Sequence, residues 1–403
     1  MDDAAQLHRR EPERSLMSAI AVKGWCPGAW RPMQSGDGLV VRIRPHGGRL
    51  SPAQAAGIAE LSGRFGNGLI DLTNRANLQL RGVSDGGHVP LLQGLAELDL
   101  LDANAGAESR RNIVVAPFWG EHDETRSIAM ELELALSACH LELPGKFGFA
   151  VDCGRERALA NVSADIRIER CAMGNIIVRA DGAAMGRPVA RTEAVATALA
   201  LAEWFVVSGG VKDGRGRMAT HLGTGARLPM ALAGSSRPAP ALPRPRPGLA
   251  SGGVLIGIAF GQLSAAALAV LARRSTGLRI TPWRMILVEG LQEMPHFEGL
   301  VTVADDPRLS IDACTGAPVC PQAHADTRAL ATALAPHLGA GASLHVSGCA
   351  KGCAHPGISA ITLVATDDGF DLIRNGFAGD KPLVHGLTRE QLLADPSVLA
   401  GDS

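Results

Sequence analysis

The chain has 403 residues, of which 46% are hydrophobic and 20% charged, and its formal net charge is −1 at pH 7. This composition is typical of a globular protein with two or more domains, and the balanced charge gives no reason to expect nucleic acid or an acidic membrane as a partner. Apolar runs end well before the ~20 residues that a membrane span needs. Residues 11–14 (EPER) follow Arg9-Arg10 where an export signal would be apolar, so we expect a cytoplasmic protein.

The first folded elements are predicted after a polar, disordered segment at residues 1–20. Residues 38–45 (GLVVRIRP) indicate a strand. Ser51 followed by Pro52 is typical of the N-cap and first turn of a helix, which should end at the glycines of residues 66–68. Residues 69–83 (LIDLTNRANLQLRGV) alternate in polarity and predict a second strand.

The same order returns after residues 234–253, where dense proline predicts an extended connector. Residues 254–261 (VLIGIAFG) indicate a strand, Ser264 a helix cap, and residues 278–291 (LRITPWRMILVEGL) another strand after Gly277. Alignment of Thr73 with Thr281 also places Gly82 on Gly290. The pattern predicts an internal duplication of a β-α-β unit.

Each duplicated unit precedes a larger mixed segment. Helical spacing occurs at residues 127–138 and 192–205 in the first half and at 326–338 in the second, and residues 358–376 predict a hairpin around Asp368-Gly369. We therefore predict an α+β protein of two pseudo-equivalent halves. The expected divisions are residues 21–104 and 105–233, then 254–304 and 305–403.

Four cysteines form a pattern that suggests an inorganic centre. Cys314 and Cys320 are separated by five residues, and Cys349 and Cys353 by three, in glycine-rich surroundings. A [4Fe–4S] cluster needs four thiolates, whereas paired zinc ligands are usually two to four residues apart. The remaining alternative is a set of buried free thiols. Cys26, Cys139, Cys153 and Cys171 are scattered, and we interpret them as core or loop thiols.

These motifs resemble the sulfite/nitrite reductase superfamily over about residues 24–386. Thr73, Arg75 and Gln79 match its T-x-R-x-x-x-Q signature, and the cysteine spacing matches its cluster motif. The resemblance implies two ferredoxin-like half-domains and two larger α/β domains, of which only the second carries a [4Fe–4S] cluster. In the reductases the last cysteine also bridges to sirohaem iron.

The resemblance also implies site residues. Arg75, Arg111 and Lys146 fall on positions that bind the anion in the reductases, but Gly148 replaces a second lysine. Loss of that cation weakens the case for sulfite or nitrite. Further donors lie in or beside the segments that line the family's tetrapyrrole pocket: Arg42, Arg44, Gln79, Arg81 and Arg110.

Residues 24–45 (GWCPGAWRPMQSGDGLVVRIRP) and the motif around Cys349 resemble a tetrapyrrole-oxidising branch of the superfamily. That branch implies oxidation of precorrin-3A by O2 in aerobic cobalamin biosynthesis. It further implies a mononuclear non-haem iron and an external electron donor, either a carrier protein or a nicotinamide cofactor. The iron ligands stay unassigned among several histidines: His46, His140, His221, His345 and His355.

Two other functions stay open. A sirohaem-dependent sulfite or nitrite reductase would share the cluster and most of the pocket. A non-catalytic iron–sulfur or zinc protein would explain the cysteines but would leave the arginine-rich first half without a role.

Overall fold

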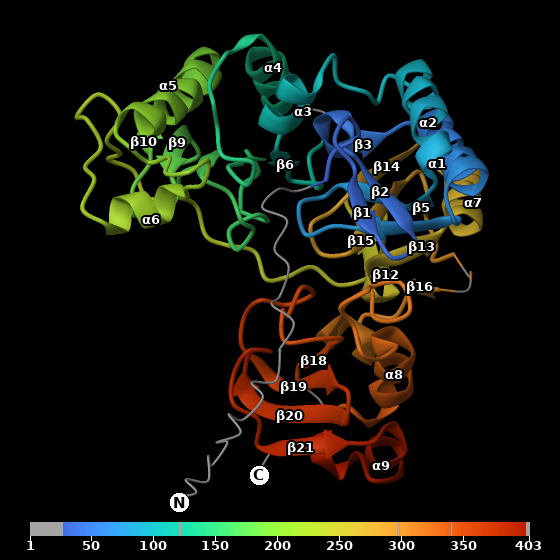
Figure 1. Cartoon of the computed structure of the whole chain (residues 1–403). Coiled ribbons are helices and arrows are strands. Elements are labelled where there is room, and N and C mark those ends of the chain that lie inside the picture. The colour runs from blue at the N-terminus through green and yellow to red at the C-terminus, as the bar shows by residue number, and fades with distance from the viewer. Residues whose placement is uncertain (1–26, 121–122, 296, 298, 340, 400–403) are drawn as a thin grey trace, which may run out of the picture.

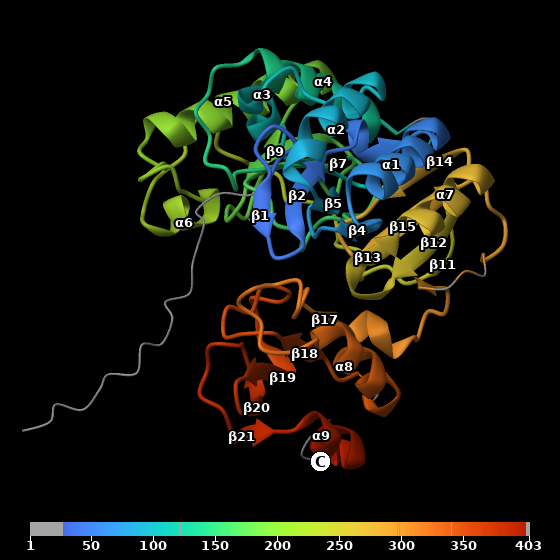
Figure 2. The same cartoon turned by 45° about the vertical axis from the view of Figure 1, so that its right-hand side comes forward.

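The computed structural model describes residues 27–120, 123–295, 297, 299–339 and 341–399 (Figure 1). The segment 1–20, predicted to be disordered, and Cys26 lie outside these residues. Two small sheets lie side by side, one α/β domain lies next to them, and the C-terminal domain lies below (Figures 1 and 2).

The first half-domain is built on a sheet of order β1-β2-β5-β4-β13. Ser51 and Gln54 form the predicted capping box at the start of its first helix. The elements of this half-domain are β1 Met33–Ser35, β2 Gly38–Ile43, η1 His46–Gly48, β3 Arg49–Leu50, α1 Pro52–Phe65, β4 Leu69–Leu72, β5 Leu78–Val83 and α2 Asp85–Glu97.

The second half-domain is built on a sheet of order β11-β12-β15-β14-β3, with β16 also paired to β12. Ser264 caps its helix, as predicted, by accepting from the backbone of Ala267. Its elements are β11 Gly248–Ala250, β12 Gly253–Ile258, η3 Ala259–Gly261, β13 Gln262–Ser264, α7 Ala265–Arg274, β14 Gly277–Ile280, β15 Met285–Glu289 and β16 Leu300–Val301.

The two half-domains exchange one short strand each. β3 precedes α1 but pairs with β14 of the second half-domain, whereas β13 precedes α7 but pairs with β4 of the first. Helices α1 and α7 lie against each other on the outer side of the sheets (Figure 2). Their apolar residues share one core with both sheets, so the halves pack as a single unit.

The duplication predicted from the sequence is confirmed by matching backbone conformations. Gly82 and Gly290 have φ values of 67° and 81°, and Ala76 and Arg284 have 54° and 59°. One prediction was wrong, because residues 69–83 and 278–291 each form a hairpin of two strands. The turns are centred on non-glycine residues with positive φ, so the sequence lacks the usual turn signal.

Two larger domains share a second topology, in which three parallel strands are followed by antiparallel ones. The first contains α3 Ala105–Arg110, β6 Ile113–Val115, α4 Thr125–Ala138, β7 Phe149–Asp152, β8 Ile166–Arg170, β9 Ile176–Ala180, β10 Arg187–Pro188, η2 Arg191–Glu193, α5 Ala194–Val207 and α6 Met218–Gly223. The second contains η4 Pro307–Ser310, β17 Ile311–Ala313, α8 Thr327–Leu334, η5 Ala335–His337, β18 Leu344–Ser347, β19 Ser359–Thr366, β20 Gly369–Gly376, β21 Val384–Leu387, α9 Arg389–Ala394 and η6 Pro396–Leu399. The predicted hairpin of residues 358–376 corresponds to β19 and β20.

The proline-rich segment differs from the expected connector because it is packed. Ser236, Pro238 and Ala241 form isolated bridges to the first α/β domain, and Ala239 is only 1% exposed. Residues Gly248–Ala250 near its end form β11. Proline restricts the chain to an extended form, which here follows the domain surface.

Candidate functional site

A row of polar side chains crosses one face of the first half-domain sheet. Arg42 pairs in register with Gln79, Gln79 with Asp71, and Asp71 with Gln262 on the exchanged strand β13. Side chains alternate along a strand, so this face is opposite the buried residues Ile43, Leu78 and Ile70. The sheet therefore presents hydrogen-bonding groups on the side that α1 does not cover.

The polar face meets the C-terminal domain. The N–H of Gly36 donates to the carbonyl of Val319 over 2.9 Å, and Arg328 of α8 contacts Asp71 at 3.3 Å. Between them lies a cavity of about 340 Å³. Its lining residues come from both domains: Asp37, Leu69, Arg81, Gln262, Thr315, Ala317, Pro318, Val319, Asp326, Arg328, Ala329 and Thr332.

The four predicted cluster cysteines lie in two loops that begin at the carboxyl ends of the neighbouring parallel strands β17 and β18. The N–H of Gly348 donates to the Cys314 sulfur over 3.2 Å, which joins the two loops. A Cβ at Gly348 would lie 2.6 Å from the Ala323 Cβ, so a glycine is needed for this approach. Cys314, Cys320 and Cys349 are half-buried, and Cys353 is exposed.

The thiols are close enough to influence one another. Burial raises the pKa of Cys349, and negative charge on Cys320 and Cys314 adds to that rise, while the backbone N–H of Lys351 opposes it. Burial also raises the pKa of Cys353, and the other three cysteines contribute. A bound metal must therefore displace protons from the thiols, and the binding will depend on pH.

Within the described residues, no three His, Cys, Asp or Glu side chains converge as ligands of a single metal ion. A [4Fe–4S] cluster has a different requirement, because each cysteine binds its own iron and the four sulfurs surround a larger object. Four thiols in two glycine-rich loops fit that donor set.

Two of the predicted anion-binding residues lie together. The Arg75 Nη2 donates to the carbonyl of Lys146 over 3.0 Å. Arg75 is half-exposed and the Lys146 side chain is exposed, so both cations face solvent-accessible space. The turn that carries Arg75 is fixed by Thr73, whose hydroxyl accepts from the backbone of Arg75 and Asn77.

Other predicted arginines are committed to protein partners. Arg111 is 4% exposed and forms a two-point contact with Asp102 at 2.7 and 2.8 Å. Burial acts to lower the pKa of Arg111, but the Asp102 carboxylate more than compensates and holds that pKa above its usual range. Arg44 donates to Glu108 over 2.6 Å. Arg110 donates to the carbonyl of Leu136 at the end of α4.

Gly148 occupies the position where the resemblance predicts a second lysine. Its N–H donates to Asp165, and a Cβ there would lie 2.7 Å from the Asn112 Nδ2. The site is buried, so a lysine side chain would have to displace Asn112. The chain therefore lacks the second lysine, and the packing around Gly148 leaves no room for one.

The candidate histidines are dispersed. His46 contacts Glu133 at 2.7 Å and His221 contacts Ser208 at 2.8 Å, both in or beside the first α/β domain. His345 and His355 lie together in the C-terminal domain, with ring centres 5.9 Å apart. His355 also contacts Asp312 at 3.1 Å. His140 lies in the loop that follows α4.

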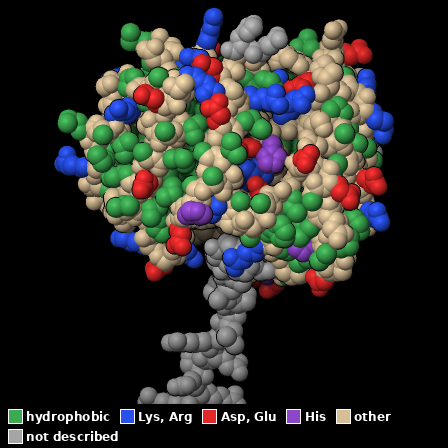
Figure 3. Space-filling model, turned by 90° about the horizontal axis from the view of Figure 1, so that it is seen from above, with side chains coloured by type: hydrophobic (Ala, Val, Ile, Leu, Met, Phe, Trp, Pro, Cys, Tyr) green, Lys and Arg blue, Asp and Glu red, His purple; other side chains and the backbone are tan. Residues whose placement is uncertain are grey.

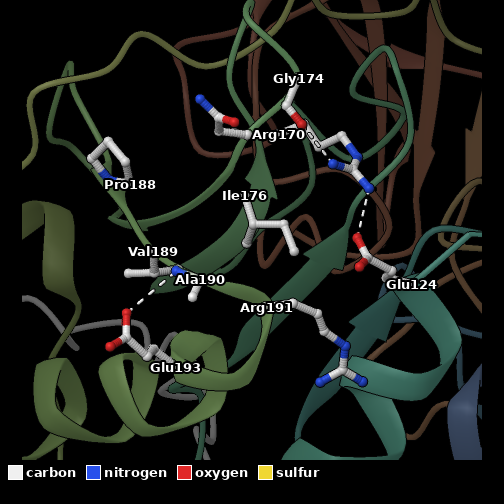
Figure 4. A pocket seen from close by; sticks show the side chains of 10 residues that line it. Glu124, Arg170, Gly174, Ile176, Pro188, Val189, Ala190, Arg191 and Glu193 are labelled. Atoms are coloured by element: carbon white, nitrogen blue, oxygen red, sulfur yellow. Dashed lines mark hydrogen bonds and ion pairs between the residues drawn. The ribbon is translucent and has the colours of Figure 1, made fainter.

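A second cavity, of about 410 Å³, lies on the first α/β domain and was not predicted from the sequence (Figure 4). Its charged side chains have partners: Arg170 contacts Glu124 at 2.6 Å, and Arg191 contacts Glu131 at 2.5 Å. Across the face seen in Figure 3, acidic and basic side chains are interspersed. None of the described helices is long and apolar enough to cross a membrane.

Comparisons with known proteins agree with this architecture. Residues 31–98 match the family model described as the nitrite/sulfite reductase ferredoxin-like half domain. A relative from Sinorhizobium sp, named precorrin-3B synthase, is 33% identical over 397 residues, which covers 89% of this chain and 84% of the relative. The chain belongs to the precorrin-3B synthase family.

Two further matches are to a nitrite reductase and to a solved structure. A ferredoxin–nitrite reductase from Synechococcus elongatus is 32% identical over 146 residues, which is 34% of this chain and 28% of that protein. The structure of the Mycobacterium tuberculosis NirA protein covers 88% of this chain and 79% of its own, with a TM-score of 0.58 at 17% identity. That likeness shows that this chain has the same overall fold as the NirA protein.

Proposed function

We propose that this protein oxidises precorrin-3A to precorrin-3B with O2, by hydroxylation of C20 and closure of a lactone with the ring-A acetate. In this reaction one oxygen atom enters the product, and the other leaves as water with two electrons and two protons from an external donor. The near full-length similarity to a precorrin-3B synthase carries the proposal. The packing of Asn112 against Gly148 supports it over anion reduction.

We assign the four cysteines to a [4Fe–4S] cluster, which supplies single electrons when bound. Cys314, Cys320, Cys349 and Cys353 would hold it as thiolates. A mononuclear non-haem iron is also part of the proposal, because side chains alone do not activate O2. Its ligands stay unassigned.

The substrate carries many carboxylates, and forked cationic donors suit them. Arg75 and Lys146 face solvent-accessible space, and Arg42 and Gln79 belong to the polar sheet face. We therefore assign these four residues to substrate binding. Arg44, Arg110 and Arg111 would instead hold the surrounding elements. Arg44 and Arg111 are buried against carboxylates, and Arg110 donates to the end of α4.

The first experiment is an absorption spectrum of anaerobically purified protein, with iron and acid-labile sulfide counted on the same sample. We expect a broad band near ~400 nm from a cluster, no sirohaem bands, and more iron than the cluster needs. Incubation with precorrin-3A and labelled O2 should then add one labelled oxygen atom to the product. Sirohaem bands in the red, with nitrite or sulfite reduction, would establish the alternative reductase function.

A further inference from the structure

The turn between β1 and β2 touches the loop that carries Cys314 and Cys320. The N–H of Gly36 donates to the Val319 carbonyl over 2.9 Å, and the Ser35 hydroxyl donates to the same oxygen over 3.4 Å. Val319 directly precedes Cys320 in the chain. A segment near the N-terminus therefore contacts the backbone beside a predicted cluster ligand.

This contact requires a residue without a side chain. A Cβ at Gly36 would overlap the Val319 carbonyl oxygen and would lie 3.4 Å from the Pro318 oxygen. The obstacle is backbone, so a larger residue cannot be accommodated by a rotamer change. Either the turn or the cysteine loop would have to move.

Arg81 fixes the shape of the turn. Its guanidinium donates to both carboxylate oxygens of Asp37, at 3.2 and 2.8 Å, and to the Ser35 hydroxyl at 2.9 Å. The Arg81 side chain is 8% exposed and that of Asp37 is 11% exposed. A two-point contact between buried charges is strongly directional, so the residues on either side of Gly36 are held in place.

We propose that residues 35–37, held by Arg81, form a clamp that positions the cysteine loop at Cys320. Arg81 is then a positioning residue for the four-cysteine site, and it does not bind the substrate as the sequence suggested. The proposal rests on the proposed function for the identity of the group that the cysteines hold. The clamp itself is a protein contact and can be tested without that group.

The test compares Gly36→Ala with Gly63→Ala in the iron-free full-length protein. Gly63 lies in α1, and a Cβ there meets nothing within 4 Å, so this substitution controls for the added methyl group. The measurement is the alkylation rate of each cysteine, read by peptide mass. In Gly36→Ala we expect Cys320 to react roughly fivefold faster, as for one lost hydrogen bond, with Cys139 unchanged.

Asp37→Asn provides a second variant that leaves the backbone contact free of steric conflict. It weakens the hold of Arg81 on the turn, and we expect the same increase at Cys320 but a smaller one. In protein that carries iron, both variants should lose it to a chelator several-fold faster than Gly63→Ala.

Unchanged Cys320 reactivity in both variants would overturn the clamp. The clamp would also be overturned if Arg81→Gln weakened tetrapyrrole binding but left Cys320 reactivity and iron retention at the wild-type level. If the protein never holds iron but Gly36→Ala still speeds Cys320 alkylation, the proposed cluster is refuted and the clamp stands.

Discussion

The two half-domain sheets each face an α/β domain, but the two interfaces are filled differently. The first sheet, whose exposed face carries the polar row, meets the C-terminal domain through Gly36 and Asp71, and a cavity remains there. The second sheet meets the first α/β domain with Leu255 and Leu287, both buried. Duplication therefore supplied two equivalent interfaces, of which one is closed by apolar packing.

The closed interface is completed by aromatic rings. Phe118 stacks on Trp283 with ring centres 6.1 Å apart, and the guanidinium of Arg279 lies 3.3 Å from the ring centre of Trp119. Arg279 also donates to the carbonyl of Pro117 over 2.7 Å. Pro117, Phe118 and Trp119 belong to the loop after β6, which corresponds to the cysteine loop after β17. The first loop fills its interface, whereas the second carries thiols.

The largest expected effect tests the same difference in the next pair of equivalent loops, which follow β7 and β18. Cys349→Ser should abolish the iron and labile sulfide of the cluster, because one of its four thiolate ligands is lost. The matched control is Cys153→Ser in the first α/β domain. Burial raises the pKa of Cys153 to about 12, so it stays a thiol and does not bind metal at neutral pH.

Iron and sulfide counts on both variants decide the result. The control should keep its full iron content despite some loss of stability. Equal iron loss in both variants would mean that the two loops do not differ as the comparison requires. Full iron in Cys349→Ser would remove that cysteine from the ligand set.

The two α/β domains should respond to acid in opposite directions. Burial lowers the pKa of His345 on β18 to about 4 and raises that of Asp152 on β7 to about 6. Folded His345 binds fewer protons than the unfolded chain between about pH 6.5 and 4, so stability falls as pH falls. Folded Asp152 binds more protons between about pH 3.8 and 6, so its contribution to stability rises as pH falls.

Each pKa shift changes the free energy of unfolding by roughly 3 kcal/mol across the pH range between the folded and unfolded pKa values. Hydrogen exchange of β7 and β18 at pH 7 and 4.5 measures the two domains separately. His345→Leu should remove the acid sensitivity of β18, and Asp152→Asn should remove the opposite trend in β7. Parallel pH trends of β7 and β18 in the wild-type protein would contradict the assignment.

A reciprocal exchange of equivalent residues tests the two interfaces directly. Alignment of Thr73 with Thr281 places Gln79 on Leu287. Leu287→Gln should destabilise the protein by about 2 kcal/mol, because the amide would be buried without partners. Gln79→Leu should change stability by less than about 1 kcal/mol but reduce tetrapyrrole affinity roughly tenfold, since one substrate hydrogen bond is lost.

Denaturant unfolding and ligand titration on both variants provide the measurements. A similar loss of stability in both would show that the first interface is packed like the second. Unchanged tetrapyrrole affinity in Gln79→Leu would remove the polar face from the substrate site.

Local signals in the sequence predicted much of the fold. Caps at Ser51 and Ser264 and the glycines at 82 and 290 are short-range features, and the structure has them as predicted. The exchange of β3 and β13 was not predicted, because two- and three-residue strands have no pattern and their partners are about 200 residues away.

The residues of the candidate site stay predictions, because their partners depend on contacts that form only on folding. The sequence supplied a set of arginines, but it could not indicate which of them are neutralised by distant carboxylates. Arg81 pairs with Asp37 and Arg111 with Asp102 only after folding. The four cysteines were singled out by their local spacing, and their role as cluster ligands stays a prediction. The polar row could be recognised only from the register of β2, β5 and β4, which forms on folding.

The smallest effect concerns Arg110, for which the sequence suggested substrate binding. Its Nε donates to the Leu136 carbonyl over 3.0 Å, at the C-terminus of α4, where a cation is favourable. In the second α/β domain, α8 continues into η5 where α4 ends at the Arg110 contact. We therefore expect Arg110 to act only at the end of α4. Arg110→Ala should lower the stability of α4 by about 1 kcal/mol and leave tetrapyrrole affinity unchanged, whereas Arg75→Ala should weaken binding with little loss of stability. Hydrogen exchange of α4 and ligand titration separate these outcomes, and reduced affinity in Arg110→Ala would restore the role in substrate binding.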